Sequence, residues 1–185
     1  MDNGASSYRR FLDGDDEGVV EIIRDYKDGL IFFIRGFVSD INTAEDLAED
    51  TFVKLVTKKP HFRGGSSFKT WLYAIGRNIA IDYLKKNSRI NNISVYDCRS
   101  ISDDEADLER AYLREEGKIL FHRALNRLKP EYRQILWLTY FEGITVKEAA
   151  RLMKKKPHNI EVLVWRAKKA LRSELEKEGF TYEGL

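Results

Sequence analysis

The sequence predicts an all-α fold, made of two small helical domains joined by a flexible acidic linker. Apolar residues recur at spacings of three and four through most of the 185 residues, as they do along amphipathic helices. Only 3 prolines and 12 glycines are present, too few for an all-β fold with many turns. A stretch without apolar periodicity, which carries a run of acidic residues, separates two helical blocks. The predicted domains are residues 8–92 and 117–178, with the linker at 93–116.

Two amphipathic helices begin the first domain. Apolar side chains at helical spacing predict one helix over Gly18–Val38. The next is predicted over Ala44–Lys58 and ends before Pro60, because proline cannot continue a helix. A capping box of Thr43 and Asp46 is expected to begin it, since both side chains can bind free N–H groups of the first turn. The face expected to turn inward comprises Ala44, Leu47, Ala48, Phe52, Leu55 and Val56.

A third helix follows a loop. Residues 61–67 contain two glycines and two serines, a composition typical of loops. Helical periodicity then runs over Phe68–Asn87. On this helix Trp71, Leu72 and Ile75 are expected to lie in the core.

The second domain ends in a helix-turn-helix pattern. Thr145 is expected to cap the first helix of the pair, and Lys154–Lys156 can form the turn. Pro157 then stands at the first helical position, where proline is tolerated. Small residues in the pair allow a close crossing, although a purely structural helical hairpin is the alternative. The four predicted helices are Ile119–Leu128, Pro130–Glu142, Thr145–Met153 and Pro157–Lys177, and the last is expected to bury Ile160, Val164, Ala167 and Leu171.

Basic residues are concentrated in two segments. Lys54–Arg89 holds nine basic residues and one acidic residue, and Val146–Lys177 holds ten and four. Two basic blocks indicate contact with a polyanion at two places, although each block alone is also typical of a solvated helix face. In the first block the cations alternate with aromatic residues, which can stack on unpaired bases while the cations follow the backbone.

Signals of several other protein classes are missing from the sequence. There is no phosphate-binding loop, dinucleotide-binding motif or zinc-ligand spacing, so we expect no catalytic site, no cofactor and no metal. The one cysteine, Cys98, cannot form an internal disulfide, which favours a reducing compartment. The segment Met1–Asp16 is polar and acidic and is not expected to act as a signal peptide. No apolar run approaches the ~20 residues that span a bilayer, so a cytoplasmic protein without membrane insertion is expected.

Two parts of the chain resemble regions 2 and 4 of extracytoplasmic-function (ECF) sigma factors. Residues 44–52 (AEDLAEDTF), 62–78 (FRGGSSFKTWLYAIGRN) and 81–84 (IDYL) are similar to region 2. Residues 128–133 (LKPEYR), continuing through the helix-turn-helix to Leu171, are similar to region 4. The resemblance implies a bacterial transcription-initiation subunit, with no active site of its own, that binds core RNA polymerase and directs it to promoters.

The resemblance also implies which residues bind each partner. The helix that starts near Ala44 would dock on the β′ clamp helices of polymerase through Asp46, Glu49, Asp50 and Lys54. The loop and the helix after it would capture a flipped base of the minus-ten element and hold the melted strand. The residues implied there are Phe62, Arg63, Gly64, Gly65, Ser66, Ser67, Phe68, Lys69, Asn78, Asp82, Lys85, Lys86 and Arg89.

The helix-turn-helix would enter the major groove of the minus-thirty-five element as a duplex and would also meet the β flap. Because such sigma factors are commonly held inactive by an anti-sigma factor, a partner of that kind belongs to the expectation. The residues implied for minus-thirty-five binding are Thr145, Lys155, Lys156, His158, Asn159, Glu161, Val162, Trp165, Arg166 and Lys169.

Some positions depart from the family's usual residues. Lys154 stands where the turn often has glycine. Glu161, Val162 and Leu163 stand where the exposed start of the recognition helix often has lysine, serine and arginine. Glutamate can accept a hydrogen bond from cytosine and valine can touch a thymine methyl, but apolar Val162 and Trp165 can also face a protein. These residues motivate a sigma-like interaction module as one alternative. A stand-alone dimeric helix-turn-helix regulator is the other, although it would not need the loop and helix over Phe62–Asn78.

Overall fold

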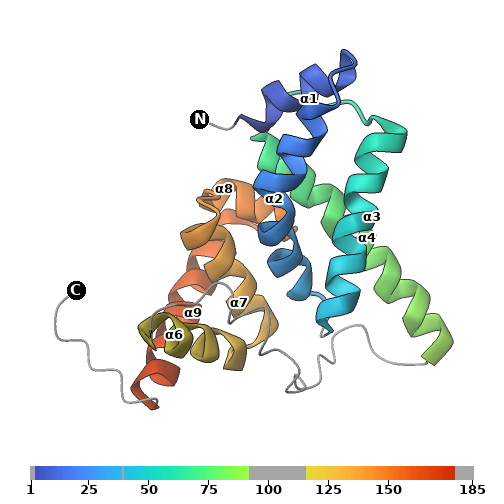
Figure 1. Ribbon diagram of the computed structural model, residues 1–185. Coiled ribbons are helices and arrows are strands. Elements are labelled where there is room, and N and C mark those ends of the chain that lie inside the picture. Colours follow the sequence, from blue (N-terminus) through green and yellow to red (C-terminus); the bar gives the residue numbers. More distant parts are fainter. Residues whose placement is uncertain (1–2, 39, 92–115, 178–185) are drawn as a thin grey trace. The chain divides into compact units, whose positions relative to one another are not determined.

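All regular elements of the described chain are helices, which confirms the predicted all-α class. The structure is a computed structural model that describes residues 3–38, 40–91 and 116–177, without the side chains of 88–91, 116–120 and 122. The helices form two compact units, the first with α1 to α4 and the second with α6 to α9 (Figure 1). Since the predicted linker lies almost wholly outside the described residues, the predicted domain boundaries stay a prediction.

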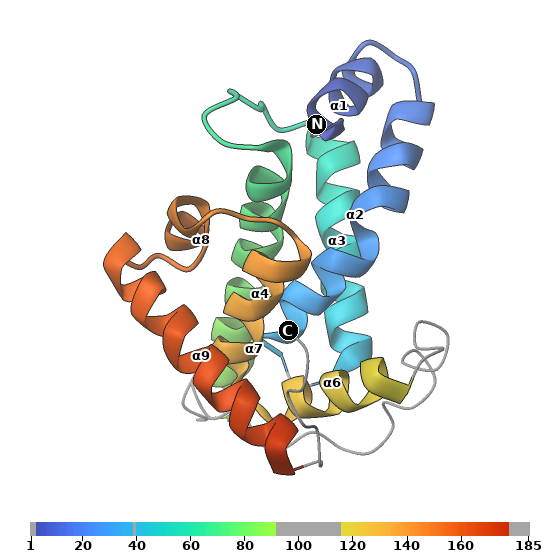
Figure 2. The ribbon, with the colours of Figure 1, turned by 90° about the vertical axis from the view of Figure 1, so that its left-hand side faces the viewer.

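The first unit is a bundle in which α2 is the central helix. Its side chains Ile22, Leu30 and Ile34 are fully buried. α2 packs against α1, α3 and α4, and Figure 2 shows α2 and α3 running side by side. The bounds are α1 (Gly4–Leu12), α2 (Glu17–Arg35), α3 (Ile41–Lys58) and α4 (Phe68–Asn91).

Helix α1 was not predicted, and it packs closely on α2. A Cβ atom on Gly18 would collide with the carbonyl oxygen of Ser7, so the approach of the two helices requires glycine there. The hydroxyl of Ser7 donates a 2.7 Å hydrogen bond to the carboxylate of Glu21, and the guanidinium of Arg10 lies 3.0 Å from the same carboxylate. These bonds, with that from Ser7 first, hold the pKa of Glu21 below its usual value. Polar contacts therefore hold α1 in place, in addition to the burial of the Tyr8 side chain.

The start of α3 differs from the prediction. Asp40 is the N-cap, and its carboxylate accepts hydrogen bonds of 2.7 Å from both the N–H and the hydroxyl of Thr43. The hydroxyl bond is the larger cause, and the N–H bond the second, of a pKa of Asp40 below its usual value. The predicted capping box of Thr43 and Asp46 is wrong, because the helix already begins at Ile41 and Thr43 lies within its first turn.

The second unit is built around α9, which packs against α6 and α7. The single helix predicted over Pro130–Glu142 is interrupted, because the chain changes from α-helix to π-helix at Trp137. The N–H of Glu142 reaches the carbonyl of Trp137, five residues back, over 3.1 Å. The bounds are α6 (Glu116–Arg127), α7 (Pro130–Leu136), η1 (Trp137–Phe141), α8 (Val146–Leu152) and α9 (Pro157–Lys177).

Candidate nucleic-acid interface

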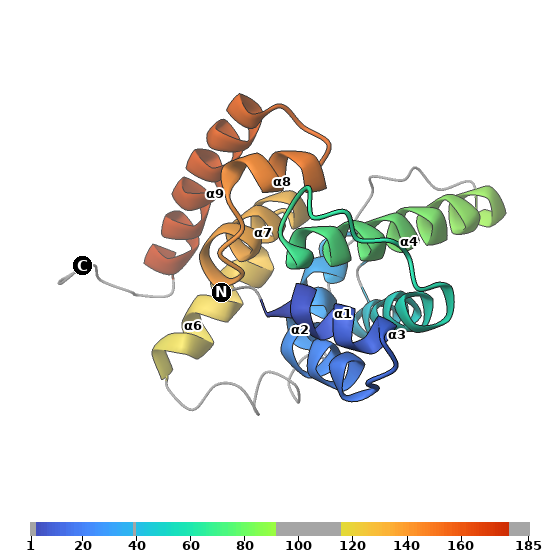
Figure 3. The same ribbon diagram turned by 90° about the horizontal axis from the view of Figure 1, so that it is seen from above.

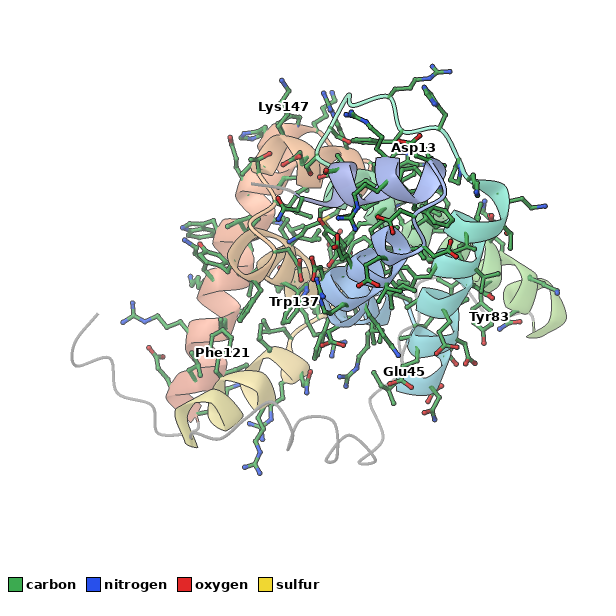
Figure 4. The ribbon with its side chains drawn as sticks, turned by 45° about the horizontal axis from the view of Figure 1, so that its top comes forward. Asp13, Glu45, Tyr83, Phe121, Trp137 and Lys147 are labelled. Carbon is green, nitrogen blue, oxygen red and sulfur yellow. The ribbon has the colours of Figure 1, made fainter. Side chains whose placement is uncertain are left out.

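Helix α3 presents a surface that combines carboxylates with apolar side chains. Figure 4 shows Glu45 among carboxylates near the N-terminal end of this helix. Two valines on the same helix are exposed, Val53 by 57% and Val56 by 38%. Val56 was expected to face the core, and that expectation is wrong. The four residues predicted to bind polymerase are all exposed, namely Asp46, Glu49, Asp50 and Lys54.

An aromatic cluster fixes both ends of the loop between α3 and α4. The ring centroid of Phe62 lies 5.6 Å from that of Phe68 and 5.2 Å from that of Trp71. Tyr8 of α1 contributes a third side, with its centroid 5.5 Å from Phe68 and 5.4 Å from Trp71. Because Phe68 is only 1% exposed, it cannot stack on a base in this structure. We therefore correct its predicted role from DNA contact to support of the loop.

The tip of this loop is open to solvent. Arg63, Gly64 and Gly65 are all exposed. The backbone of Gly64 has a φ of 71°, in the left-handed region that favours glycine. No heavy atom lies within 4 Å of the place where a Cβ would stand on either glycine. A ligand can therefore approach Gly64 and Gly65 from the side on which a Cβ would stand.

The two serines of the loop have local hydrogen bonds. Ser67 caps α4, because its Oγ accepts a 3.2 Å hydrogen bond from the N–H of Thr70 and lies 2.8 Å from the hydroxyl of Thr70. The hydroxyl of Ser66 donates to the carbonyl of Ser67 over 3.2 Å. The ammonium of Lys69 lies 5.9 Å from the ring centroid of Tyr26. In Ser67 a predicted DNA-binding hydroxyl is thus engaged in starting the helix.

A polar stripe continues from the loop along α4. The exposed residues Asn78 and Asp82 are four apart, and Trp71 stands seven before Asn78, so the three share one face of the helix. Trp71 and Ile75 are half-buried, whereas Leu72 alone of the three expected core residues is fully buried. Lys85 and Lys86 are also exposed, and the side chain of Arg89 lies outside the described residues.

The helix-turn-helix is closed by caps on both sides of α8. At its start, the hydroxyl of Thr145 donates to the carboxylate of Glu148 over 2.8 Å, and the N–H of Glu148 donates back to that hydroxyl over 3.3 Å. The predicted cap is therefore confirmed. At its end, Lys154 has a φ of 51°, and the N–H of Lys155 reaches the carbonyl of Ala150 over 2.9 Å. Lys154 thus holds the left-handed backbone that explains why glycine suits this position.

Helix α9 follows the turn, as Figure 3 shows, and most of its predicted DNA-binding residues are exposed. Leu163 is buried, 8% exposed, together with Ile160 and Ala167, so its predicted place on the exposed start of the helix is wrong. Val164 and Leu171 are half-buried instead. Val162 is half-buried too, and the exposed members of the predicted set are Thr145, Lys155, Lys156, His158, Asn159, Glu161, Trp165, Arg166 and Lys169.

Cations accompany the exposed aromatic rings of the second unit. Trp165 is 63% exposed, and the ammonium of Lys169 lies 5.6 Å from its ring centroid. Tyr140 is 56% exposed, with the ammonium of Lys168 at 5.0 Å from its centroid. Tyr140 was not predicted as a surface residue, because a pattern of period 3.6 cannot reveal the π-helix that carries it. Lys155 is paired with Glu131 at 2.8 Å.

Two further searches concern only the described part of the chain. No group of three or more His, Cys, Asp or Glu side chains in it is placed to hold a metal ion. None of its helices is long and apolar enough to cross a membrane.

Residues 22–90 match the family Sigma-70 region 2, and residues 118–171 match the family Sigma-70, region 4. The chain belongs to the sigma-70 family. The first match runs from Ile22 within α2 to Ile90 near the end of α4, whereas α1 precedes it. The second match runs from Lys118 within α6 to Leu171 within α9.

This sigma factor is similar to several known sigma factors, one of which is named as a member of the ECF group. It is 29% identical over 171 residues to the RNA polymerase sigma-H factor of Pseudomonas aeruginosa, with 88% of this chain and 89% of that protein covered. It is 26% identical over 155 residues to the ECF RNA polymerase sigma factor SigX of Bacillus subtilis, with 82% and 80% covered. The structure of the sigma factor RpoE in complex with the anti-sigma factor NepR, from Bartonella quintana, matches with a TM-score of 0.61 and 25% identity, covering 84% of this chain and 95% of that one.

The chain is thus an ECF sigma factor that acts in promoter-specific transcription initiation with RNA polymerase. Together these findings confirm the family resemblance and the two-domain fold.

Proposed function

We propose that the loop tip at Arg63, Gly64 and Gly65 captures an unpaired base of the minus-ten element and so holds the promoter open. The observation that carries this proposal is a contrast within the loop. Its tip is open to solvent, whereas its two ends are fixed. The tip is exposed, with room at its main chain. Phe62 and Phe68, on either side of it, are held by ring contacts in the aromatic cluster. A loop that is already ordered loses little conformational entropy when it binds a strand.

The polar stripe of α4 would extend this site along the melted strand. Asn78 has both donor and acceptor groups for a base edge, and Lys85 and Lys86 carry charge for the phosphates. The single strand would leave the loop tip and follow this stripe.

Helix α3 would bind the β′ clamp helices of core polymerase. Val53 and Val56 give an apolar centre, which is exposed here and would be buried in the complex. Asp46, Glu49 and Asp50 border it and would pair with basic residues of the clamp. An apolar centre with a charged rim is the usual arrangement of a protein interface.

The helix-turn-helix would bind the minus-thirty-five duplex and the β flap. Lys156, Arg166 and Lys169 would neutralise phosphates, while Glu161 and Val162 would meet base edges in the major groove. Polymerase performs the chemistry, in the bacterial cytoplasm, and this chain contributes recognition and opening. An anti-sigma factor is the regulator expected for such surfaces, as the complex of the Bartonella quintana relative suggests.

The test is run-off transcription on fragmented genomic DNA of the source bacterium with sigma-free core polymerase, with and without this protein. Discrete new start sites that need the protein are expected, and thymines near each start should become reactive to permanganate. Tight binding to a two-fold symmetric duplex by the chain alone, without new starts, would instead support the stand-alone regulator. Core binding without new starts would support the interaction module.

A further inference from the structure

A cavity of about 390 Å³ lies between α1 and the loop that carries the proposed base-capture tip. This volume falls within the range of sites that take small ligands, ~300–1,000 Å³. Four lining residues belong to α1 and four to the loop: Ala5, Tyr8, Arg9, Leu12, His61, Phe62, Arg63 and Gly64.

The lining combines apolar walls with a basic rim. Phe62 provides aromatic surface and Ala5 and Leu12 provide aliphatic surface, whereas Tyr8, only 2% exposed, adds little surface of its own. The rim consists of Arg9, His61 and Arg63, which are all exposed. None of these three side chains forms an ion pair or hydrogen bond with a described residue. Arg10, the neighbour of Arg9, differs in this respect, because it is paired with Asp15 and Glu21.

A nucleotide has the chemistry that this lining would accept. Its base is planar and largely apolar on both faces, so it can lie against the half-buried ring of Phe62 and the exposed side chain of Leu12. Its phosphates are anionic, so they can lie near the guanidinium groups of the rim. An apolar peptide side chain would fill the walls and leave the arginines unpaired. An inorganic anion would pair with the arginines and leave the apolar walls uncovered.

The cavity is held in shape before any ligand binds. The phenol of Tyr8 donates a 2.8 Å hydrogen bond to the carbonyl of Pro60, where the loop begins. The ammonium of Lys59 lies 4.7 Å from the ring centroid of Phe11 and so adds a second link between α1 and the loop. Because both walls are fixed, little ordering is needed on binding.

We propose that α1 forms one wall of a single-nucleotide pocket, which holds the base captured by the loop, and that Arg9 contacts the phosphate of that nucleotide. This inference rests on the proposed function, since it assigns α1 a part in base capture. It goes beyond the family match, which begins at residue 22 and does not include α1.

The test uses holoenzyme, assembled from the full chain and core polymerase, and a promoter found by run-off. The DNA is pre-melted over the minus-ten element, and its non-template strand carries an abasic site at each position in turn. Two variants probe the pocket. Arg9→Ala removes the cation, and Ala5→Phe fills the cavity. Lys27→Ala, an exposed cation on α2 outside the cavity, is the matched control for charge.

Arg9→Ala and Ala5→Phe should weaken binding of the single strand in different ways. Arg9→Ala is expected to bind the intact strand about tenfold more weakly, the size of one hydrogen bond to a charged group, and Lys27→Ala within about twofold of wild type. Ala5→Phe should lose affinity for the intact strand. At one abasic position it should lose nothing further, because the base that it excludes is already missing. Thermal unfolding of each variant checks that the fold is retained.

Three outcomes decide the matter. Non-additivity at one abasic position, with a loss for Arg9→Ala alone among the two cation variants, supports the pocket. If wild-type holoenzyme opens promoters and binds the strand, but both pocket variants bind like Lys27→Ala, the pocket is overturned while the proposed function stands. If wild-type holoenzyme opens no promoter, both the proposed function and the pocket are contradicted.

Discussion

The phenol of Tyr8 and the carbonyl of Pro60, 52 positions apart in the chain, are joined by a 2.8 Å hydrogen bond. This bond connects α1 directly to the start of the loop that carries Arg63 and Gly64. Tyr8 is only 2% exposed, and its ring also packs against Phe68 and Trp71. Tyr8, on a helix that precedes the residues matched to the family, thus helps to hold the loop of the candidate nucleic-acid interface in place.

Tyr8→Phe removes this hydrogen bond and keeps the ring. We expect the free energy of unfolding of the first unit to fall by about 1 kcal/mol, the usual net value for one such bond. Hydrogen–deuterium exchange should show faster exchange in α1 and in the residues after Pro60, with α9 unchanged. Unaltered exchange in α1 would mean that ring packing alone holds the helix.

The same residue predicts an alkaline effect. Burial raises the pKa of Tyr8 to about 12 from 10.0, so the folded state favours the protonated phenol. Its contribution to stability is complete below pH 10 and is lost as the pH rises towards 12. Since phenylalanine does not titrate, the stability advantage of wild type over Tyr8→Phe should shrink between these values. Denaturant unfolding of both proteins at several pH values measures it, and a constant difference would contradict the prediction.

Gly18→Ala should displace α1. The new methyl group would meet the carbonyl oxygen of Ser7 and the backbone nitrogen of Phe11, neither of which can move without the helix. We expect a loss of about 1–3 kcal/mol in the stability of the first unit, as for other overpacked sites. Gly65→Ala is the matched control, because nothing lies within 4 Å of its new methyl group and its φ is not positive. Equal melting temperatures of Gly18→Ala and Gly65→Ala would contradict this prediction, because they would show that α1 and α2 can move apart without loss of stability.

Asp40→Ala tests the start of α3. Loss of this cap should cost about 1 kcal/mol at neutral pH, and Asp40→Asn much less. Because the pKa of Asp40 is lowered by folding, its charge stabilises the protein above the usual value of 3.8, and that contribution is lost as the pH falls through the folded pKa. The gap between Asp40→Ala and wild type should therefore narrow in acid. Asp46→Ala discriminates the two possible starts, since a capping box at Thr43 would make it the more harmful change.

Lys154→Gly should stabilise the second unit by about 0.5–1 kcal/mol. The left-handed backbone at Lys154 strains any side chain with a Cβ, and the relief exceeds the entropy that glycine loses on folding. Lys156→Gly removes the same charge from the same turn without relieving strain, so it should be neutral or destabilising. Chemical unfolding followed at Trp137 would rank the two variants, and the reverse ranking would contradict the explanation.

Helical periodicity predicted most elements, because the spacing of apolar residues along the sequence shows which face of a helix is buried. Helix α9 was predicted with its bounds, Pro157–Lys177, since proline at the first turn adds a second signal to the periodicity. Helix α1 was missed because it is short and its residues lie in an acidic segment. Its contacts, such as Tyr8 with Pro60, depend on residues far away in the sequence.

The errors within the site have a different cause. Asp40 and Thr43 are both good caps, and only the backbone conformation at Asp40 decides between them. Val56 and Leu163 stand at the margins of apolar faces, where a small rotation of the helix decides exposure. Phe68 was placed on the DNA because it lies in the matching loop segment, but its burial follows from the aromatic rings that surround it. The polar residues Asp46, Glu49, Asp50 and Lys54 of α3, and those of the loop tip, were correctly expected at the surface.

Asp50→Lys and Asn78→Ala should separate polymerase binding from promoter opening. Asp50 lies beside the exposed Val53 on α3, so reversal of its charge should weaken association with core polymerase by about tenfold or more. Asn78 lies on the α4 stripe, so Asn78→Ala should associate normally and give less permanganate reactivity at the minus-ten element. Asp28→Lys, an equal charge reversal at an exposed position of α2, controls for net charge. Fluorescence anisotropy with core polymerase and footprinting of the holoenzyme measure the two steps. If Asp28→Lys weakens association as much as Asp50→Lys does, the α3 surface is not the polymerase-binding site. If Asn78→Ala opens promoters fully, the α4 stripe does not take part in opening.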